Sequence, residues 1–190
     1  MVIKMKIQLG ISNRHIHLTK EDYEILFGNA ILTKRNDLVQ PNEYASTSVV
    51  TIEGPKNKIE KVRVLGPFRP YTQVEVSTTD TYKLGINKVV RTSGDLEDAE
   101  TLTIIGPQGS ITRKCAIIAT RHIHINQEDV KKHNLDPKKL YKVKINTEKG
   151  AILENIHLKV TENAVLELHL DTDDANACLL TQKDEVELIK

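Results

Sequence analysis

One short motif occurs twice in this chain and limits how the chain can fold. Residues 13–18 read NRHIHL and residues 120–125 read TRHIHI, so the motif returns after about 107 residues. Successive side chains of a β-strand point to opposite faces, so the two histidines of each copy share one face and the isoleucine between them lies on the other. A repeat at such a fixed interval indicates two related halves.

Short helices are predicted after both copies of the motif. Thr19 and Asn126 are the predicted N-caps, because each precedes a charged two-turn helical segment and has an acidic residue three positions further on. Two further short helices are predicted, one in STTDTYKLG with Asp80 as its N-cap and one in DTDDANACLL with Thr172 or Asp173 as its N-cap. The two halves therefore match in layout as well as in letters.

Most of the remaining chain consists of short runs in which apolar and polar residues alternate, such as IKMKIQL, SVVTI, TQVEVS and YKVKI. Turn signals such as EGPKN, GPFRP and GPQGS separate these runs. Many brief strands with this punctuation indicate an antiparallel β-barrel or sandwich, and not a series of βαβ units. The polar stretch over residues 27–48 is expected to be a loop or an irregular excursion.

Composition excludes several classes of function. The formal net charge is +1, there is no long basic run, aromatic residues make up 4% and tryptophan is absent, so no nucleic-acid partner is expected. No apolar stretch approaches the length of a membrane span, and the first residues lack the apolar core of a signal peptide. Two cysteines form neither a disulfide scaffold nor a CxxC zinc site, which favours a reducing cytoplasm.

The paired histidines indicate metal binding. Histidine nitrogen is a standard zinc donor, and catalytic zinc often keeps three protein ligands and one open position. Each pair supplies two ligands, so each site needs at least one more. His169, on the alternating strand VLELHL, is the favoured third imidazole. The other histidines are His133, expected to face solvent from a charged helix, and His157, interpreted as a strand-surface residue.

The segment GPFRPYTQVEVSTTD offers a different third ligand. Gln73 and Glu75 share one strand face, so Glu75 could complete a site of two histidines and one glutamate. Arg69 lies six residues earlier, and a guanidinium is a planar fork that suits phosphate oxygens. Taken alone, however, this segment favours an exposed glutamate on an amphipathic strand.

Two rival functions fit parts of the pattern. A cupin-like metal-binding or ligand-binding module would use an HxHxxxE pattern, with Glu21 and Glu128 as the acids. Both acids fall in the first turn of a predicted helix, where the helix dipole already accounts for them. A dinuclear metallohydrolase also begins with HxH, but within a (β/α)8 barrel of about 250 residues with alternating long helices.

Six segments in order, ISNRHIHL, GPFRPYTQVEVS, LGI, IGPQG, ATRHIHI and LHLDTDDANA, resemble the phosphotransacylases of the propanediol-utilisation type, the phosphate propanoyltransferase family. The resemblance runs over nearly the whole chain and departs from the family pattern at Lys88-Val89, where Ala-Pro is usual. It implies a mainly β fold of two β-barrels with short capping helices, related by an internal repeat. Residues 13–118 would form the first barrel, and residues 119–190 the second, completed by the N-terminal strand 1–12.

The resemblance also implies an activity, the reversible conversion of acyl-CoA and phosphate into acyl phosphate and CoA, with a short propanoyl or acetyl group. It implies two divalent metal ions per chain, usually zinc, with Arg69 contacting phosphate. One ion would be bound on the phosphate side by His15, His17 and Glu75, and the other would face the sulfur of coenzyme A from His122, His124 and His169.

Partners and location follow from the same resemblance. The partners would be small molecules, with no membrane or nucleic acid involved, and the chain would form a homodimer. Only about a dozen residues precede RHIHL, and they read as a strand, not as an amphipathic leader helix. We therefore expect a cytoplasmic protein that is not encapsulated in a microcompartment.

Overall fold

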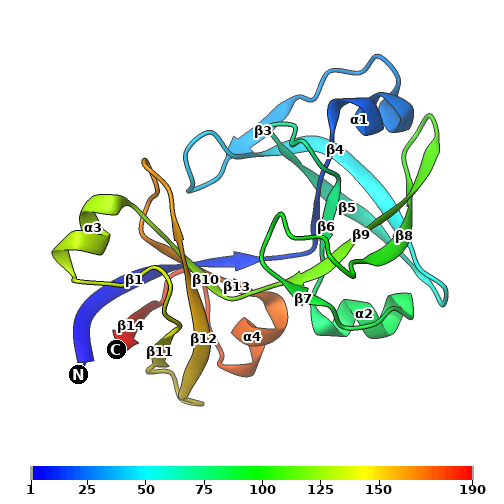
Figure 1. The fold of residues 1–190 in the computed structure, drawn as a ribbon. Coiled ribbons are helices and arrows are strands. Elements are labelled where there is room, and N and C mark those ends of the chain that lie inside the picture. The colour runs from blue at the N-terminus through cyan, green and yellow to red at the C-terminus, as the bar shows by residue number, and fades with distance from the viewer. Residues whose placement is uncertain (1, 190) are drawn as a thin grey trace. The chain divides into compact units, whose positions relative to one another are not determined.

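The computed structural model describes residues 2–189, which form mostly strands and four short helices (Figure 1). The chain divides into two units. The central unit contains residues 13–38 and 42–119, and the C-terminal unit contains residues 2–12, 39–41 and 120–189. We expected residues 39–41 in the first barrel, but they belong to the C-terminal unit, because Gln40 hydrogen-bonds to that unit at Val165 and Glu167.

The central unit is a closed ring of six strands. Going around the ring, they are β4 (Tyr44–Glu53), β5 (Lys58–Gly66), β2 (His15–His17), β6 (Gln73–Glu75), β9 (Ser110–Ala119) and β8 (Glu100–Ile105), which pairs with β4 again. Two short strands extend it, β3 (Lys34–Asp37) beside β4 and β7 (Val90–Arg91) beside β9. The expectation of a purely irregular stretch at residues 27–48 was wrong, because β3 pairs there with the start of β4.

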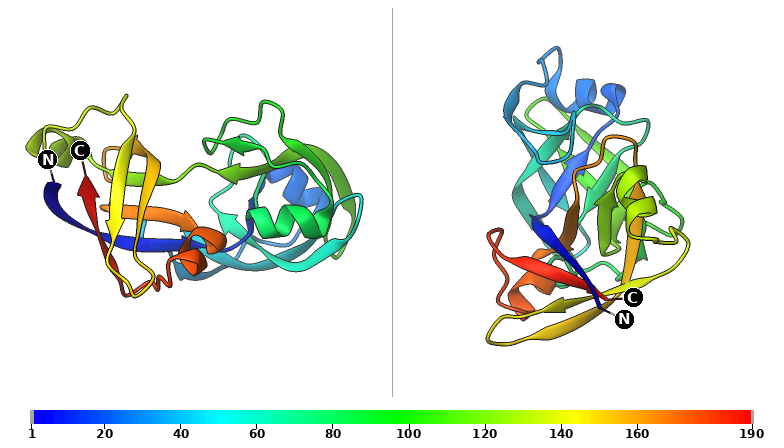
Figure 2. Two further views of the ribbon diagram at one scale, coloured as in Figure 1. Left: turned by 90° about the horizontal axis from the view of Figure 1, so that it is seen from below. Right: turned by 90° about the vertical axis from the view of Figure 1, so that its left-hand side faces the viewer.

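The C-terminal unit is also a closed six-stranded barrel. Its order is β1 (Val2–Ser12), β13 (Glu167–Asp171), β10 (His122–Ile125), β12 (Ala151–Val160), β11 (Tyr141–Ile145) and β14 (Glu185–Ile189). Strand β14 closes the ring by pairing antiparallel with β1, and Figure 2 shows these two strands, in red and blue, side by side. The predicted mainly β fold of two barrels with short helices is therefore confirmed.

The two barrels repeat one topology. Strand β2 lies between a parallel neighbour, β5, and an antiparallel one, β6, and β10 lies in the same way between β12 and β13. The strand that leads into each HxH motif is exchanged: β1 precedes β2 but completes the C-terminal barrel, and β9 precedes β10 but completes the central barrel. Each half of the sequence thus supplies the strand that closes the barrel of the other half.

Strand alternation explains the two separate cores. The burial of β11 alternates strictly, with Tyr141, Val143 and Ile145 buried and the lysines between them exposed. One apolar cluster fills the C-terminal barrel and another fills the central barrel. Each cluster contains one of the two cysteines, Cys178 in the former and Cys115 in the latter.

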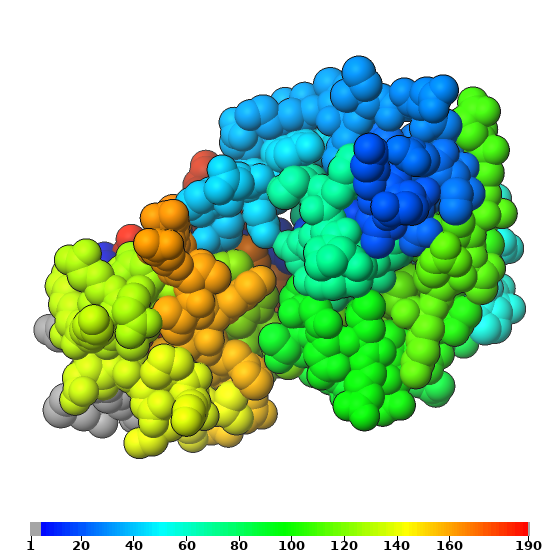
Figure 3. Space-filling view, turned by 45° about the horizontal axis from the view of Figure 1, so that its top comes forward, coloured from blue at the N-terminus to red at the C-terminus, as the bar shows by residue number. Residues whose placement is uncertain are grey.

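The four helices are α1 (Lys20–Phe27), α2 (Thr78–Leu84), α3 (Gln127–Lys132) and α4 (Thr172–Ala177). Helices α1 and α3 begin at the predicted caps. In Figure 3, α1 (blue) lies against the turn between β8 and β9 (green), where Gln108 donates its backbone N–H to the carbonyl of Leu26. None of the helices among the described residues is long and apolar enough to span a membrane.

The predicted caps of α2 and α4 were wrong. Ser77 caps α2, and Asp80 is its third residue, completing a reciprocal capping box with Ser77. Asp171 caps α4 and accepts the backbone N–H of Asp174. In both cases the chain turns from strand to helix within two residues, so the cap lies earlier than the composition suggested.

Gly10 allows a close approach between β1 and β13. It pairs with His169, and a Cβ at this position would lie 2.6 Å from Glu167 Oε1 and 2.6 Å from His169 Cδ2. Both side chains are held by hydrogen bonds, so neither can move away without losing a partner. The strand therefore requires glycine here for space.

We predict that Gly10→Ala lowers the free energy of unfolding by about 1–3 kcal/mol, the usual cost of overpacking a filled site. Urea denaturation followed by circular dichroism measures this. Gln8→Ala is the control, because Gln8 is exposed on the same strand and its loss should cost about 0.5 kcal/mol or less. Equal stabilities for the two variants would contradict the proposed clash.

Candidate metal centres

The first candidate centre lies in the central unit, on neighbouring strands β2 and β6. His15 is paired in register with Glu75, and His17 lies on the same face two residues further on. Both histidines are buried, at 7% and 3% exposure. His15 Nε2 lies 3.5 Å from Glu75 Oε2, and one donor atom from each of the three residues lies within 4.8 Å of the others.

The second candidate centre has the same layout in the C-terminal unit. His122 on β10 is paired in register with His169 on β13, and His124 completes the group. Nε2 of His122 lies 3.2 Å from Nε2 of His124, and donor atoms of all three rings lie within 4.8 Å of one another. His169 occupies the register position that Glu75 has in the first group.

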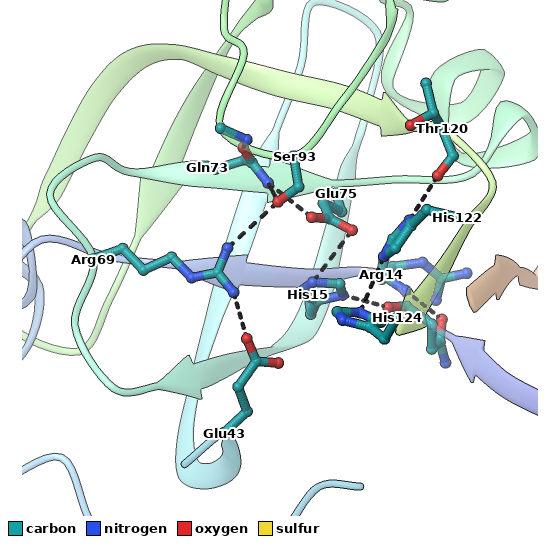
Figure 4. A network of polar contacts seen from close by, with 12 residues as sticks. Arg14, His15, Glu43, Arg69, Gln73, Glu75, Ser93, Thr120, His122 and His124 are labelled. Atoms are coloured by element: carbon teal, nitrogen blue, oxygen red, sulfur yellow. Dashed lines mark hydrogen bonds and ion pairs between the residues drawn. The ribbon is translucent and has the colours of Figure 1, made fainter. Parts of the chain in front are cut away.

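A backbone carbonyl orients the first histidine of each group. Nδ1 of His15 lies 2.9 Å from the carbonyl oxygen of Asn13, and Nδ1 of His122 lies 2.8 Å from that of Thr120 (Figure 4). A carbonyl oxygen only accepts, so Nδ1 must carry the proton in both rings. The lone pair is then on Nε2, which faces the other members of the group, as in histidines that bind a metal.

Both groups fit a divalent cation. A tetrahedral zinc ion with nitrogen ligands at about 2.0–2.1 Å separates two ligand atoms by about 3.4 Å. The separations of 3.5 Å between His15 and Glu75 and 3.2 Å between His122 and His124 are close to that value. In the second group, Nε2 of His122 faces Nε2 of His124, so a proton or a cation must lie between the two nitrogens. A divalent cation can take the place of that proton.

The other candidates from the sequence lie elsewhere. His133 follows α3 as its C-cap, and His157 on β12 pairs with His122 without joining either group of donors. Glu21 and Glu128 are exposed in the first turns of α1 and α3, so the HxHxxxE pattern does not form a site. Six strands in each barrel and four short helices also differ from the (β/α)8 barrel of the metallohydrolase alternative.

Each third ligand is held by the side chain two residues before it. In the first group, Nε2 of Gln73 donates to Oε1 of Glu75 at 2.7 Å. In the second, Glu167 occupies the position of Gln73, and its Oε2 lies 2.8 Å from Nε2 of His169. An amide donor thus accompanies the carboxylate, and a carboxylate acceptor accompanies the imidazole.

Gln40 extends the second group. Its Nε2 donates to Oε2 of Glu167 at 2.7 Å and to the carbonyl of Val165 at 3.0 Å. Burial alone would raise the pKa of Glu167, but hydrogen bonds with His169 and Gln40 and the electrostatic influence of the neighbouring imidazoles outweigh it and lower that pKa below its ordinary value. The carboxylate is therefore charged beside the imidazole. Sequence analysis missed Gln40, because it lies in a polar loop that carries no periodic signal.

Arg69 lies in the central unit with a partner on each side (Figure 4). Its Nη2 donates to Oε1 of Glu43 at 2.8 Å, whereas Nη1 is 3.4 Å from Ser93 Oγ and 3.5 Å from Tyr71 OH. These last two contacts are longer than the roughly 2.7–3.2 Å that is usual for N–H···O hydrogen bonds. One edge of the guanidinium is thus firmly held while the other makes only weak contacts.

Ser93 connects Arg69 to the first group. Its hydroxyl oxygen accepts from Nε2 of Gln73 at 2.9 Å, and Gln73 donates in turn to Glu75. The oxygen of the Gln73 side chain accepts the backbone N–H of Gly94 at 2.7 Å, which ties the loop to the strand. Glu43 and Ser93 were not expected from the sequence, since both lie in irregular segments that the fold brings beside Arg69.

Neither cysteine is suited to act as a nucleophile. Burial raises the pKa of the Cys115 thiol to about 12, so almost none of it is thiolate at neutral pH. Burial also raises the pKa of Cys178, which is part of the other core. Both side chains therefore serve packing.

Comparison with known proteins shows which family the chain belongs to. The family model described as phosphate propanoyltransferase matches residues 8–181. The chain is 45% identical over 187 residues to a phosphate propanoyltransferase of Thermotoga maritima, covering 97% of this chain and 89% of that protein. Proteins of the same name from Priestia megaterium and Rhodopseudomonas palustris are 44% and 42% identical, over 94% and 97% of this chain and 83% of each relative. This chain belongs to the phosphate propanoyltransferase family.

Proposed function

We propose that this chain catalyses reversible, metal-dependent acyl transfer between coenzyme A and phosphate. In the forward direction, a phosphate oxygen forms a bond to the acyl carbon, the carbon–sulfur bond breaks, and coenzyme A leaves as thiol or thiolate. In the reverse direction, the sulfur of coenzyme A forms a bond to the acyl carbon, and the bond between that carbon and the phosphate oxygen breaks. The observation that carries the proposal is the pair of buried three-donor groups in a chain of this family, which differ in charge.

A divalent cation in such a group supplies Lewis-acid polarisation and lowers the pKa of a group that it binds. We propose zinc, because imidazole and carboxylate are common zinc ligands. His15, His17 and Glu75 would hold one ion, and His122, His124 and His169 the other. The first set carries one negative charge from Glu75, and the second set is neutral in its ligands.

This difference suggests a division of labour. Three neutral imidazoles leave the full charge of a cation available, which suits the soft, anionic sulfur of coenzyme A. The set with Glu75 has a harder donor and one charge less, which suits a phosphate oxygen. Arg69, connected to Glu75 through Ser93 and Gln73, restores positive charge on that side.

Arg69 would orient the phosphate. Glu43 fixes Nη2, so the plane of the guanidinium is set before the anion arrives, and Nη1 exchanges its weak contacts for a charge-assisted hydrogen bond. Ser93, whose Oγ lies 3.4 Å from Nη1, would contact the same anion. Preorganised donors of this kind lower the barrier because they need not reorganise during the reaction.

No side chain needs to form a covalent intermediate in this scheme. Phosphate itself attacks the acyl carbon, and the buried cysteines take no part.

We further propose that the acyl group is short, acetyl or propanoyl, and that the protein is a cytoplasmic homodimer. Gel filtration with light scattering tests the dimer, and relative kcat/KM for acetyl-CoA and propanoyl-CoA tests the acyl group.

We predict about two divalent ions per chain, since each group needs one. His17→Ala and His124→Ala each remove one ligand from a different group, so each variant should retain about one ion. Elemental analysis after gel filtration measures the content. Active wild-type protein without bound metal would refute the metal-dependent mechanism, and His133→Ala, outside both groups, should keep both ions.

We predict that Arg69→Ala raises KM for phosphate by about 10–100-fold, because a charge-assisted hydrogen bond contributes about 1.5–3 kcal/mol. His169→Ala should chiefly impair the reverse reaction with coenzyme A varied. Steady-state kinetics with each substrate varied separately measures both effects. Arg113→Ala is the control, because Arg113 pairs with Asp22 and not with this site. An unchanged phosphate KM in folded, metal-loaded Arg69→Ala would contradict the division of labour.

We predict that Cys115→Ala and Cys178→Ala keep kcat within about tenfold of wild type, whereas loss of a true nucleophile costs about a millionfold. The coupled assay of acyl-CoA with phosphate measures this, and circular dichroism checks folding. Loss of turnover in either folded variant would restore a covalent acyl-enzyme as the leading mechanism.

A further inference from the structure

The arginine that precedes each HxH motif takes no part in the scheme above, although it is repeated with the motif. In the central unit, Nε of Arg14 donates to both carboxylate oxygens of Asp80, at 2.8 and 2.9 Å. Asp80 is 3% exposed and is the third residue of α2. Its carboxylate also accepts the backbone N–H of Ser77, so Arg14 is tied to the start of that helix.

The same pair is present in the C-terminal unit. Nε and Nη2 of Arg121 donate to the two carboxylate oxygens of Asp174, at 2.7 and 2.6 Å. Asp174 is the third residue of α4, and its backbone N–H donates to the cap residue, Asp171. Arg121 also donates to the carbonyl of Glu154 on β12. Two occurrences at matching positions indicate a role that is connected with the repeated site.

The position of the arginines in the chain explains that role. Each lies between the carbonyl that orients the first histidine and that histidine itself: Asn13 and His15 flank Arg14. Each aspartate belongs to the helix that begins just after the third ligand, since Ser77 follows Glu75 by two residues and starts α2. The ion pair therefore joins the loop before the paired histidines to the helix after the third ligand.

The C-terminal unit repeats this connection residue for residue. Thr120 and His122 flank Arg121, and Asp171 follows His169 by two residues and starts α4. Each ion pair thus connects the segment before the paired histidines directly to the helix that follows the third ligand of the same group. It adds a second connection between the third ligand and the histidines to the short ladder between two brief strands.

We infer that Arg14 and Arg121 are positioning residues, which use Asp80 and Asp174 to set the distance between the paired histidines and the third metal ligand. The inference rests on the proposed metal centres. A carboxylate paired with a planar guanidinium has a defined orientation, whereas lysine offers a point charge on a flexible stem. Each pair acts on its own centre only.

A third Arg–Asp pair provides a matched control. Arg113 on β9 donates through Nη2 and Nε to Asp22, at 2.6 and 3.2 Å, and Asp22 is a buried residue of α1. It resembles both other pairs in chemistry, and its aspartate is buried like Asp80. It does not, however, join the loop before an HxH motif to the helix after a third ligand, so its loss should leave metal affinity unchanged.

The test is a crossed titration with Co²⁺, followed by its visible absorption, on metal-free protein. His124→Ala retains only the first centre, and His17→Ala retains only the second. In the first background, Arg14→Lys should weaken Co²⁺ binding about tenfold or more and alter the absorption band, as loss of supporting contacts does elsewhere. Arg121→Lys and Arg113→Lys should leave both unchanged there. In the second background, Arg121→Lys should weaken Co²⁺ binding and alter the absorption band, whereas Arg14→Lys should leave both unchanged.

Asp80→Asn and Asp174→Asn provide an independent measurement, because asparagine loses the charge that pairs with the arginine, and at position 80 its oxygen can still accept the N–H of Ser77. Urea denaturation of metal-free protein separates global stability from ligand positioning. Equal Co²⁺ affinity in all arginine variants would overturn the inference while leaving the metal centres intact. Affinity that falls equally with Arg113→Lys would also overturn it, as a general effect of stability. Absence of Co²⁺ binding by the unsubstituted chain would overturn the metal centres and the inference together.

Discussion

Antiparallel pairing between each HxH strand and the strand of the third ligand is the constraint on which both candidate centres depend. The pairing aligns His15 with Glu75 and His122 with His169. A slip of one residue would turn the ligands to the opposite face. The residues between them prevent such a slip, because Ile16 and its partner Val74 are fully buried in the core of the barrel. The apolar face thus fixes the geometry of the polar face.

The two groups of donors share one strand frame and differ at two of its positions. The third ligand is glutamate in one half and histidine in the other, and the side chain two residues earlier changes from Gln73 to Glu167. The second change matches the first, since an amide donates to a carboxylate and a carboxylate accepts from an imidazole. Each buried ligand therefore keeps a hydrogen-bonding partner, as a buried polar group requires.

Strand exchange links the two halves at the level of topology. The central barrel closes only with β9, which belongs to the second half of the repeat, and the C-terminal barrel closes only with β1, which belongs to the first. A closed ring leaves no unpaired edge within the six strands. Neither half of the sequence could therefore complete its own barrel alone, which gives the repeat a structural reason to persist as a pair.

The sequence by itself determined the strand-rich class, the shared face of each histidine pair, and the caps of α1 and α3, because strand periodicity and capping are local properties. It favoured His169 as a third imidazole, but a local pattern could not show which pair of histidines His169 joins. Only the tertiary structure decided which distant residues meet. The alternation that put Gln73 and Glu75 on one face could not show that this face is turned to His15, and the segment alone favoured an exposed glutamate. Gln40, Glu43 and Ser93 lie in irregular segments without periodicity. They reach the sites because the closure of the barrels fixes where those segments run, and this depends on pairings between residues far apart in the chain.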